Sequence, residues 1–155
     1  MTEDRFRRWL PPRKGIRLLD IGCGTAEEAG ELLASGKVAD FLGVDLDERA
    51  IVEAQARWPE ARFMCEDAVR LSPEAVGRFE VILIRRPDLL AQPARWHPVF
   101  LRLPVLLRPA GRVIVTLIGG GEAALAQRWL EEAGLRILQV EDRREPEERY
   151  WILAE

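Results

Sequence analysis

Residues 18–26 read LLDIGCGTA, and this stretch decides the fold. A short apolar run leads into a Gly-x-Gly turn, and a segment of helical character follows. Glycines permit the turn and let backbone groups approach a ligand, while the N-terminus of the next helix favours a negatively charged group. The stretch therefore predicts a strand, a ligand-binding turn and a helix.

Two other glycine-rich motifs fit this turn poorly. A dinucleotide-binding fingerprint needs a third glycine where Glu27 stands, and the Glu27 carboxylate would face the pyrophosphate. A Walker P-loop would need Gly-Lys-Ser/Thr after the turn, and this tripeptide is missing. Both motifs are therefore disfavoured.

Outward from the turn, short β-branched or Leu-rich runs alternate with stretches rich in Ala, Glu and Arg. This alternation is typical of a parallel sheet covered by helices. We expect strands at 16–21, 39–45, 61–65, 80–85, 112–118, 135–141 and 148–154. We expect helices at 25–35, 47–57, 73–77, 95–107 and 121–133.

Local signals support several of these boundaries. A capping box at Thr25–Glu28 predicts the start of the first helix, and Asp47 and Ser72 are expected N-caps. The last two strands are separated only by the charged segment 143–149, which predicts an antiparallel hairpin.

The 18–26 stretch resembles the first motif of the class I, Rossmann-like, S-adenosylmethionine-dependent methyltransferases, and the similarity extends over nearly the whole chain. The resemblance implies one α/β domain over residues 1–155. Its fold would be three-layered (α/β/α), with a mostly parallel seven-stranded sheet and an antiparallel C-terminal strand. It also implies S-adenosylmethionine as the cofactor and methyl transfer to an acceptor that the sequence does not identify.

The resemblance assigns the methionine part of the cofactor to the turn. Gly22, Cys23 and Gly24 would supply backbone contacts, including N–H groups for the carboxylate, and Asp20 would contact the ammonium group. The family's third glycine is Ala26 here, which is a small departure.

The nucleoside part would lie against the next two strands. Asp45, at the end of the second expected strand, can accept hydrogens from both ribose hydroxyls, with Leu46 beside it. Asp67 and Ala68 resemble the family's adenine-binding Asp-Ala step. The alternative is that Asp45 and Asp67 are ordinary loop acids at strand ends.

Residues for the chemistry are harder to choose. The chain contains no Asn, so the Asn-Pro-Pro-Tyr type of amino-methylation signature is absent. Arg85 and Arg86 offer planar forks suited to a carboxylate or phosphate, and Arg85 is a candidate catalytic and cofactor-binding residue. Its alternative is a solvated surface arginine. His97 is the candidate base, and its alternative is a capping or packing role.

The composition and charge argue against several other classes of protein. The 155 residues carry 23 basic and 26 acidic side chains, for a net charge of -3, so no global positive field attracts nucleic acid. No run is long enough to span a membrane, no leader is recognisable, and no metal site is expected, so we expect a cytoplasmic protein. The lack of Asn favours a GC-rich or thermophilic source.

The expected cofactor site has little chain to cover it. It would therefore accept a large substrate, be closed by homo-oligomerisation, or have lost turnover. The alternative to an active enzyme is accordingly a non-catalytic module that binds S-adenosylmethionine or S-adenosylhomocysteine in regulation or assembly.

Overall fold

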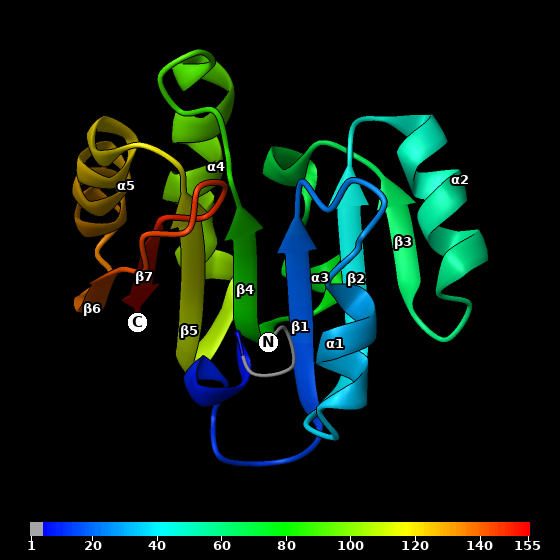
Figure 1. The fold of residues 1–155 in the computed structure, drawn as a ribbon. Helices are drawn as coiled ribbons and strands as arrows, with labels where there is room; N and C mark the ends of the chain where they lie inside the picture. The colour runs from blue at the N-terminus through cyan, green and yellow to red at the C-terminus, as the bar shows by residue number, and fades with distance from the viewer. Residues whose placement is uncertain (1–4) are drawn as a thin grey trace.

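The structure is a computed structural model that describes residues 5–155, and it contains one seven-stranded sheet between layers of helices (Figure 1). The strands are β1 (Ile16–Ile21), β2 (Val38–Asp45), β3 (Arg62–Cys65), β4 (Phe79–Arg85), β5 (Leu107–Leu117), β6 (Ile137–Asp142) and β7 (Tyr150–Ala154). The α-helices are α1 (Ala29–Ala34), α2 (Glu48–Arg57), α3 (Pro73–Val76), α4 (Pro93–Leu106) and α5 (Gly120–Glu132), with 3-10 turns η1 (Arg7–Trp9) and η2 (Ala68–Arg70).

The strand order is β3-β2-β1-β4-β5-β7-β6. Strands β1 to β5 pair in parallel, and β7 lies antiparallel between β5 and β6. The predicted fold class and the C-terminal hairpin are thereby confirmed. The central strands β1 and β4 are buried almost throughout, as expected of mostly apolar strands covered on both faces.

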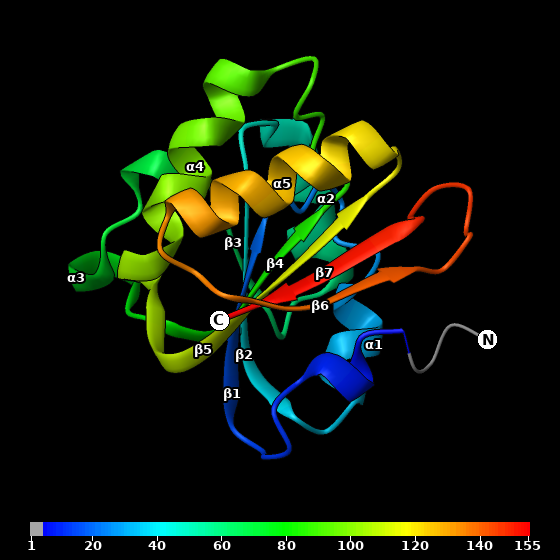
Figure 2. The same cartoon turned by 90° about the vertical axis from the view of Figure 1, so that its left-hand side faces the viewer.

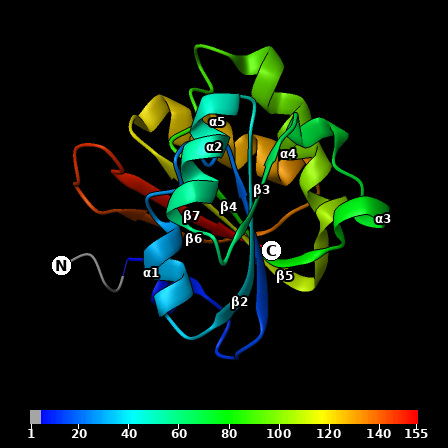
Figure 3. The ribbon, with the colours of Figure 1, turned by 90° about the vertical axis from the view of Figure 1, so that its right-hand side faces the viewer.

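Two apolar layers cover the two faces of the sheet. The larger one includes side chains of α3, α4 and α5, and the other includes η1, α1 and α2. The side views show these two sets of helices on opposite sides of the strands (Figures 2 and 3). The carboxyl ends of the parallel strands all reach one edge of the sheet, which we call the carboxyl edge.

Alternation along the strands places a row of polar side chains on the α1 face of the sheet. Asp20 pairs in register with Leu83 of β4, and Thr116 lies between Arg85 and Trp151. Successive side chains of a strand point to opposite faces. Asp20, Arg85 and Thr116 therefore share the face that α1 and η1 cover.

The first helix begins later than predicted. Helix α1 starts at Ala29 instead of residue 25, and Glu28 makes no capping hydrogen bond. Its carboxylate instead accepts a hydrogen bond from Arg85, and Ala26 has a left-handed φ of 56° that interrupts a helix. The predicted capping box is therefore wrong.

Other boundaries agree more closely with the sequence. Asp47 caps α2 by accepting from Arg49 and Ala50, and Ser72 caps α3. Strand β5 begins five residues earlier than predicted, because Leu107 already pairs with Phe79. In the part of the chain that is described, every helix is too short or too polar to cross a bilayer.

Candidate functional site

The glycine-rich turn leaves β1 at the carboxyl edge and is tied to the end of β2. The N–H groups of Gly22 and Cys23 donate to the Val44 carbonyl at 2.8 and 3.0 Å. The N–H of Gly24 donates to Asp45 Oδ2 at 2.8 Å. These donors are therefore occupied, and the N–H contacts predicted from the turn to a ligand are not available in this geometry. The backbone carbonyls of the turn only accept hydrogen bonds, so they suit the ammonium group and not the carboxylate.

Gly22 and Gly24 both have a positive φ, but the space around the two positions differs. Gly22 has a φ of 72°, and a Cβ at this position would lie 3.2 Å from Trp96. Gly24 has a φ of 55°, and a Cβ there would meet nothing within 4 Å. The turn is thus closely packed at Gly22 and open at Gly24, as a ligand-binding loop requires.

Asp45 organises the cleft beside the turn. Its Oδ2 accepts from Gly24, and its Oδ1 accepts from the Asp47 N–H at 2.9 Å. Asp45 remains partly exposed at the end of β2. Further lining residues, from the ends of β1 to β3 and from α4, are Ile21, Gly22, Val44, Leu46, Glu66, Asp67, Ala68, Arg95, Trp96 and Val99. The predicted nucleoside-binding residues therefore share one cleft.

The carboxylates of Glu66 and Asp67, directly after β3, line this cleft. The Asp67 N–H donates to Glu66 Oε1 at 2.9 Å, and Asp67 Oδ1 accepts from Val69 at 3.1 Å. Asp67 is the N-cap of η2. Asp67 thus caps η2 and also lines the cleft.

Trp96 forms the wall of the cleft against Gly22, which the sequence did not predict. Its Nε1 donates to Asp88 Oδ1 at 2.9 Å, and the other Asp88 oxygen accepts from Gln92 at 2.6 Å. Partial burial acts to raise the pKa of Asp88, but the hydrogen bonds from Trp96 and Gln92 outweigh it and hold this pKa below its ordinary value. The β4–α4 connection therefore positions Trp96 against the turn.

Asp20 lies fully buried beneath the turn. Neither of its carboxyl oxygens accepts a hydrogen bond from a residue that the structure describes. Burial raises the pKa of Asp20 well above its ordinary value, and the neighbouring Glu28 carboxylate raises it further. A buried acid with unused acceptors fits the cationic group that the sequence assigned to it.

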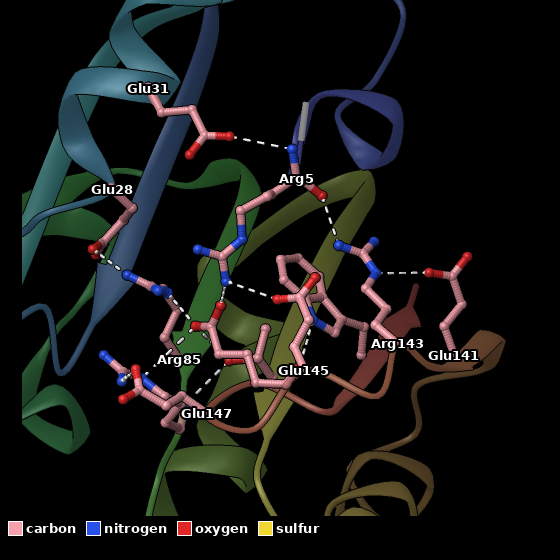
Figure 4. Close-up of polar contacts among 12 residues, drawn as sticks. Arg5, Glu28, Glu31, Arg85, Glu141, Arg143, Glu145 and Glu147 are labelled. Atoms are coloured by element: carbon pink, nitrogen blue, oxygen red, sulfur yellow. Dashed lines mark hydrogen bonds and ion pairs between the residues drawn. The ribbon is translucent and has the colours of Figure 1, made fainter. Parts of the chain in front are cut away.

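Arg85, the other candidate at the end of β4, is enclosed by carboxylates. Its Nη1 donates to Glu28 Oε2 at 2.6 Å, and its Nε donates to Glu148 Oε1 at 2.5 Å (Figure 4). Glu148 also pairs with Arg5 and accepts from Thr116 Oγ1 at 3.2 Å. We call Arg5, Glu28, Arg85 and Glu148 the charge network.

The charge network joins four segments that are distant in the sequence. Glu28 precedes α1, Arg85 ends β4, Glu148 lies in the hairpin loop 143–149, and Arg5 precedes η1. Side-chain exposure is 4% for Glu28, 12% for Arg85 and 2% for Glu148. Nε and Nη1 of Arg85 are thus used for internal structure, and Arg85 does not line the Asp45 cleft.

His97 lies elsewhere. Its Nε2 is 3.1 Å from Glu132 Oε2, and its ring stacks on Trp129 of α5. Neighbouring helix residues point in directions about 100° apart, so Trp96 faces the cleft and His97 faces α5. The geometry gives the predicted catalytic role of His97 no support.

Cys23 packs in the apolar layer on the α1 face of the sheet. It is buried, and its Sγ would lie 2.8 Å from a Cβ at Gly43. Burial, followed by the charges of Asp20 and Asp45, raises the pKa of its thiol far above the ordinary value. The thiol is therefore protonated and unreactive near neutral pH.

Comparison with known proteins agrees with this geometry. A family described as "Methyltransferase domain" matches residues 18–111. The chain is 34% identical over 116 residues to 27-O-demethylrifamycin SV methyltransferase of Amycolatopsis mediterranei, which covers 71% of this chain and 41% of the relative. It is 32% identical over 127 residues to the ubiquinone/menaquinone biosynthesis C-methyltransferase UbiE of Dinoroseobacter shibae, which covers 73% and 46%.

The chain thus spans less than half the length of these curated relatives. Among solved structures, magnesium protoporphyrin IX methyltransferase from Synechocystis PCC 6803, with bound S-adenosylmethionine, has a similar fold. Its TM-score is 0.75 at 20% identity, and the match covers 99% of this chain and 77% of that one.

Proposed function

Because the chain belongs to the class I S-adenosylmethionine-dependent methyltransferase family, we propose that it transfers a methyl group from S-adenosylmethionine to an acceptor bound over the end of β4. The observation that carries this proposal is Asp45. Its carboxylate ends β2 inside the cleft and is held by the backbone of the glycine turn and by Asp47. The chain's own hydrogen bonds thus orient an acid for the ribose hydroxyls.

The proposed cofactor contacts follow the cleft. Asp45 and Leu46 would hold the ribose, and Asp67 and Ala68 would hold the adenine from its edge. These assignments use carboxylate oxygens where the nucleoside presents donors. Trp96 closes the opposite side of the cleft.

The methionine part would lie against the turn. Gly22, Cys23 and Gly24 supply its backbone surface, and buried Asp20 supplies negative charge for the ammonium group. Two neighbouring buried acids, Asp20 and Glu28, favour a cationic group here. Glu28 is already neutralised by Arg85, so Asp20 is the acid left for the ligand.

When bound, S-adenosylmethionine supplies an activated methyl group on a sulfonium. The protein then has to place the acceptor atom in line with it, and such placement accounts for a large part of a rate enhancement. We assign no general base, since His97 faces α5. Positioning by the residues at the end of β4 is the proposed contribution of this chain to the reaction.

The cofactor assignment is tested by calorimetric titration of S-adenosylmethionine, S-adenosylhomocysteine and NAD. We expect the first two to bind and NAD not to bind. Asp45→Ala should weaken binding of both by about 100-fold, because charge-assisted hydrogen bonds contribute about 1.5–3 kcal/mol each. Asp142→Ala, on the exposed end of β6, is the matched control and should bind like the parent protein.

Tighter binding of NAD, or unchanged affinity in Asp45→Ala, would contradict the assignment. Release of S-adenosylhomocysteine in the presence of a cell extract then tests turnover. Cofactor binding without release would identify the chain as a binding module instead of an enzyme.

A further inference from the structure

A second pocket opens on the carboxyl edge beside the cofactor cleft. It has a volume of about 430 Å³, which lies in the range of small-molecule sites. The end of β4 and the hairpin loop 143–149 form most of its wall, and Glu27 forms the side next to the glycine turn. Because β4 neighbours β1, the pocket lies next to the glycine turn, on the side where the proposed function places the acceptor.

The two adjacent arginines in this pocket have different environments. Arg85 donates two hydrogen bonds to buried carboxylates and belongs to the charge network. The Arg86 side chain donates no hydrogen bond to any residue in the described part of the chain, and 36% of it is exposed. Its Nη1 and Nε form only long ion pairs, at 3.6 Å from Glu147 Oε2 and 3.8 Å from Glu148 Oε1, so its donors are not committed to a hydrogen bond.

The backbone of Arg86 is held in an unusual conformation. Its φ is 50°, a left-handed value that is rare for residues other than glycine. Its N–H donates to the Thr116 carbonyl at 2.9 Å and to Thr116 Oγ1 at 3.1 Å, and these bonds stabilise the conformation. Backbone strain of this kind is concentrated at functional sites. Here it occurs at Arg86, whose side chain lines the pocket and makes ion pairs but no hydrogen bond within the described residues.

Glu147 shows where an anion fits against Arg86. Its Oε2 lies 3.6 Å from Arg86 Nη1, too far for a hydrogen bond, and its side chain is 83% exposed. Such an exposed ion pair contributes little free energy and is readily displaced. A ligand carboxylate could form the two parallel hydrogen bonds that Glu147 does not form.

The remaining charges of the pocket limit the ligand to one negative charge. Arg5 also lines the pocket, but it is already paired with Glu148 and lies 3.6 Å from Glu145, and Glu27 adds a further carboxylate. A second negative charge on the ligand would face these carboxylates. A monocarboxylate is therefore favoured over a phosphate dianion or a nucleic acid.

We propose that the methyl acceptor is a small molecule with one carboxylate, and that Arg86 binds this carboxylate after Glu147 swings away. This inference rests on the proposed function for the identity of the pocket as an acceptor site. Arg86 is then a specificity-determining residue, while Arg85 holds the wall behind it.

The test uses benzoate as the probe, with benzamide as its neutral isostere and phenyl phosphate as the dianion. Binding to protein saturated with S-adenosylhomocysteine is followed by ¹H–¹⁵N spectra. We expect benzoate to shift signals of Arg86 and of residues 145–148, and to bind at least tenfold more tightly than either comparison compound. Equal or tighter binding of benzamide or phenyl phosphate would overturn the proposal.

Three variants separate the residues. Arg86→Gln should weaken benzoate binding about tenfold, and Glu147→Gln should strengthen it several-fold because the competing carboxylate is gone. Arg144→Gln, in the same loop and outside the pocket lining, should bind like the parent protein. Unchanged benzoate affinity in Arg86→Gln would refute the role of Arg86, provided that its affinity for S-adenosylhomocysteine is normal.

The two proposals fail in different ways. If the parent protein binds no S-adenosylhomocysteine but still binds benzoate through Arg86 in its absence, the proposed function fails and the anion site stands. If it binds S-adenosylhomocysteine but not benzoate, only the acceptor inference fails.

Discussion

The two halves of the carboxyl edge are formed by different kinds of chemical group. Over β1 to β3, backbone N–H groups and the Asp45 carboxylate shape an open cleft. Over β4 and β5, long charged side chains from four segments meet in the charge network. The first half is encoded in short local motifs, whereas the second requires residues as distant as Arg5 and Glu148. The half proposed to bind the cofactor is therefore specified locally, and the half proposed to bind the acceptor is specified by the complete fold.

If this contrast is correct, the largest loss of stability should come from the acceptor half. Arg85→Met leaves Glu28 and Glu148 buried without their shared cation, which costs about 3–5 kcal/mol. The thermal midpoint should fall by about 10 °C in calorimetry. Arg149→Met removes an exposed ion pair with Asp142 and should leave the midpoint nearly unchanged. Equal effects of the two variants would remove the distinction between the halves.

The β4–α4 connection should affect ligand binding more than stability. Asp88→Ala frees the Trp96 indole that packs on Gly22, and we expect S-adenosylmethionine to bind about fivefold to tenfold more weakly. Gln92→Ala removes the other hydrogen bond to Asp88 and should have a smaller effect. Calorimetric titration measures both. Full affinity in Asp88→Ala would show that Trp96 holds its place by packing alone.

Asp20 should show a stability effect and a binding effect of opposite sign. Its pKa is raised in the folded protein, so the folded state retains a proton that the unfolded state releases above its ordinary pKa near 4. This contribution lowers stability as pH rises from that value toward the folded pKa. Asp20→Asn removes the contribution, so it should be more stable than the parent at pH 8 in urea unfolding while binding S-adenosylmethionine more weakly. Reduced stability at pH 8 would contradict the assignment.

The smallest effect concerns the two thiols. Cys65 is exposed, whereas Cys23 is buried and has a strongly raised pKa. At pH 8, a thiol-specific reagent should therefore label Cys65 rapidly and Cys23 only on unfolding. Cys65→Ser should abolish the rapid phase. Two equally rapid phases would show that the turn around Cys23 opens in solution.

Much of the fold could be predicted from the sequence because its signals are local. The apolar runs identify the strands, and Asp47 caps its helix as the sequence predicts. The capping box failed because Glu28 binds Arg85, which lies 57 residues further along the chain. A rule based on neighbouring residues cannot detect such a partner.

The same reasoning explains what was missed at the site. His97 was selected for its ordinary pKa, but its surroundings come from Trp129 and Glu132 of another helix. Glu148 has no distinctive sequence signal, since it is one of six charged residues in the loop 143–149, three on each side of Pro146. Only the pairing of β7 with β5 brings it next to Arg85 and Thr116.

The ion pair between Arg5 and Glu148 also has a consequence for folding during synthesis. These residues are 143 positions apart, so their contact cannot form until residue 148 has left the ribosome. The residues of the cofactor cleft, from Ile21 to Val99, all emerge earlier. At about 5–20 residues per second, roughly 50 further residues take several seconds. During that interval the nascent chain has every residue of its cofactor cleft and no acceptor pocket.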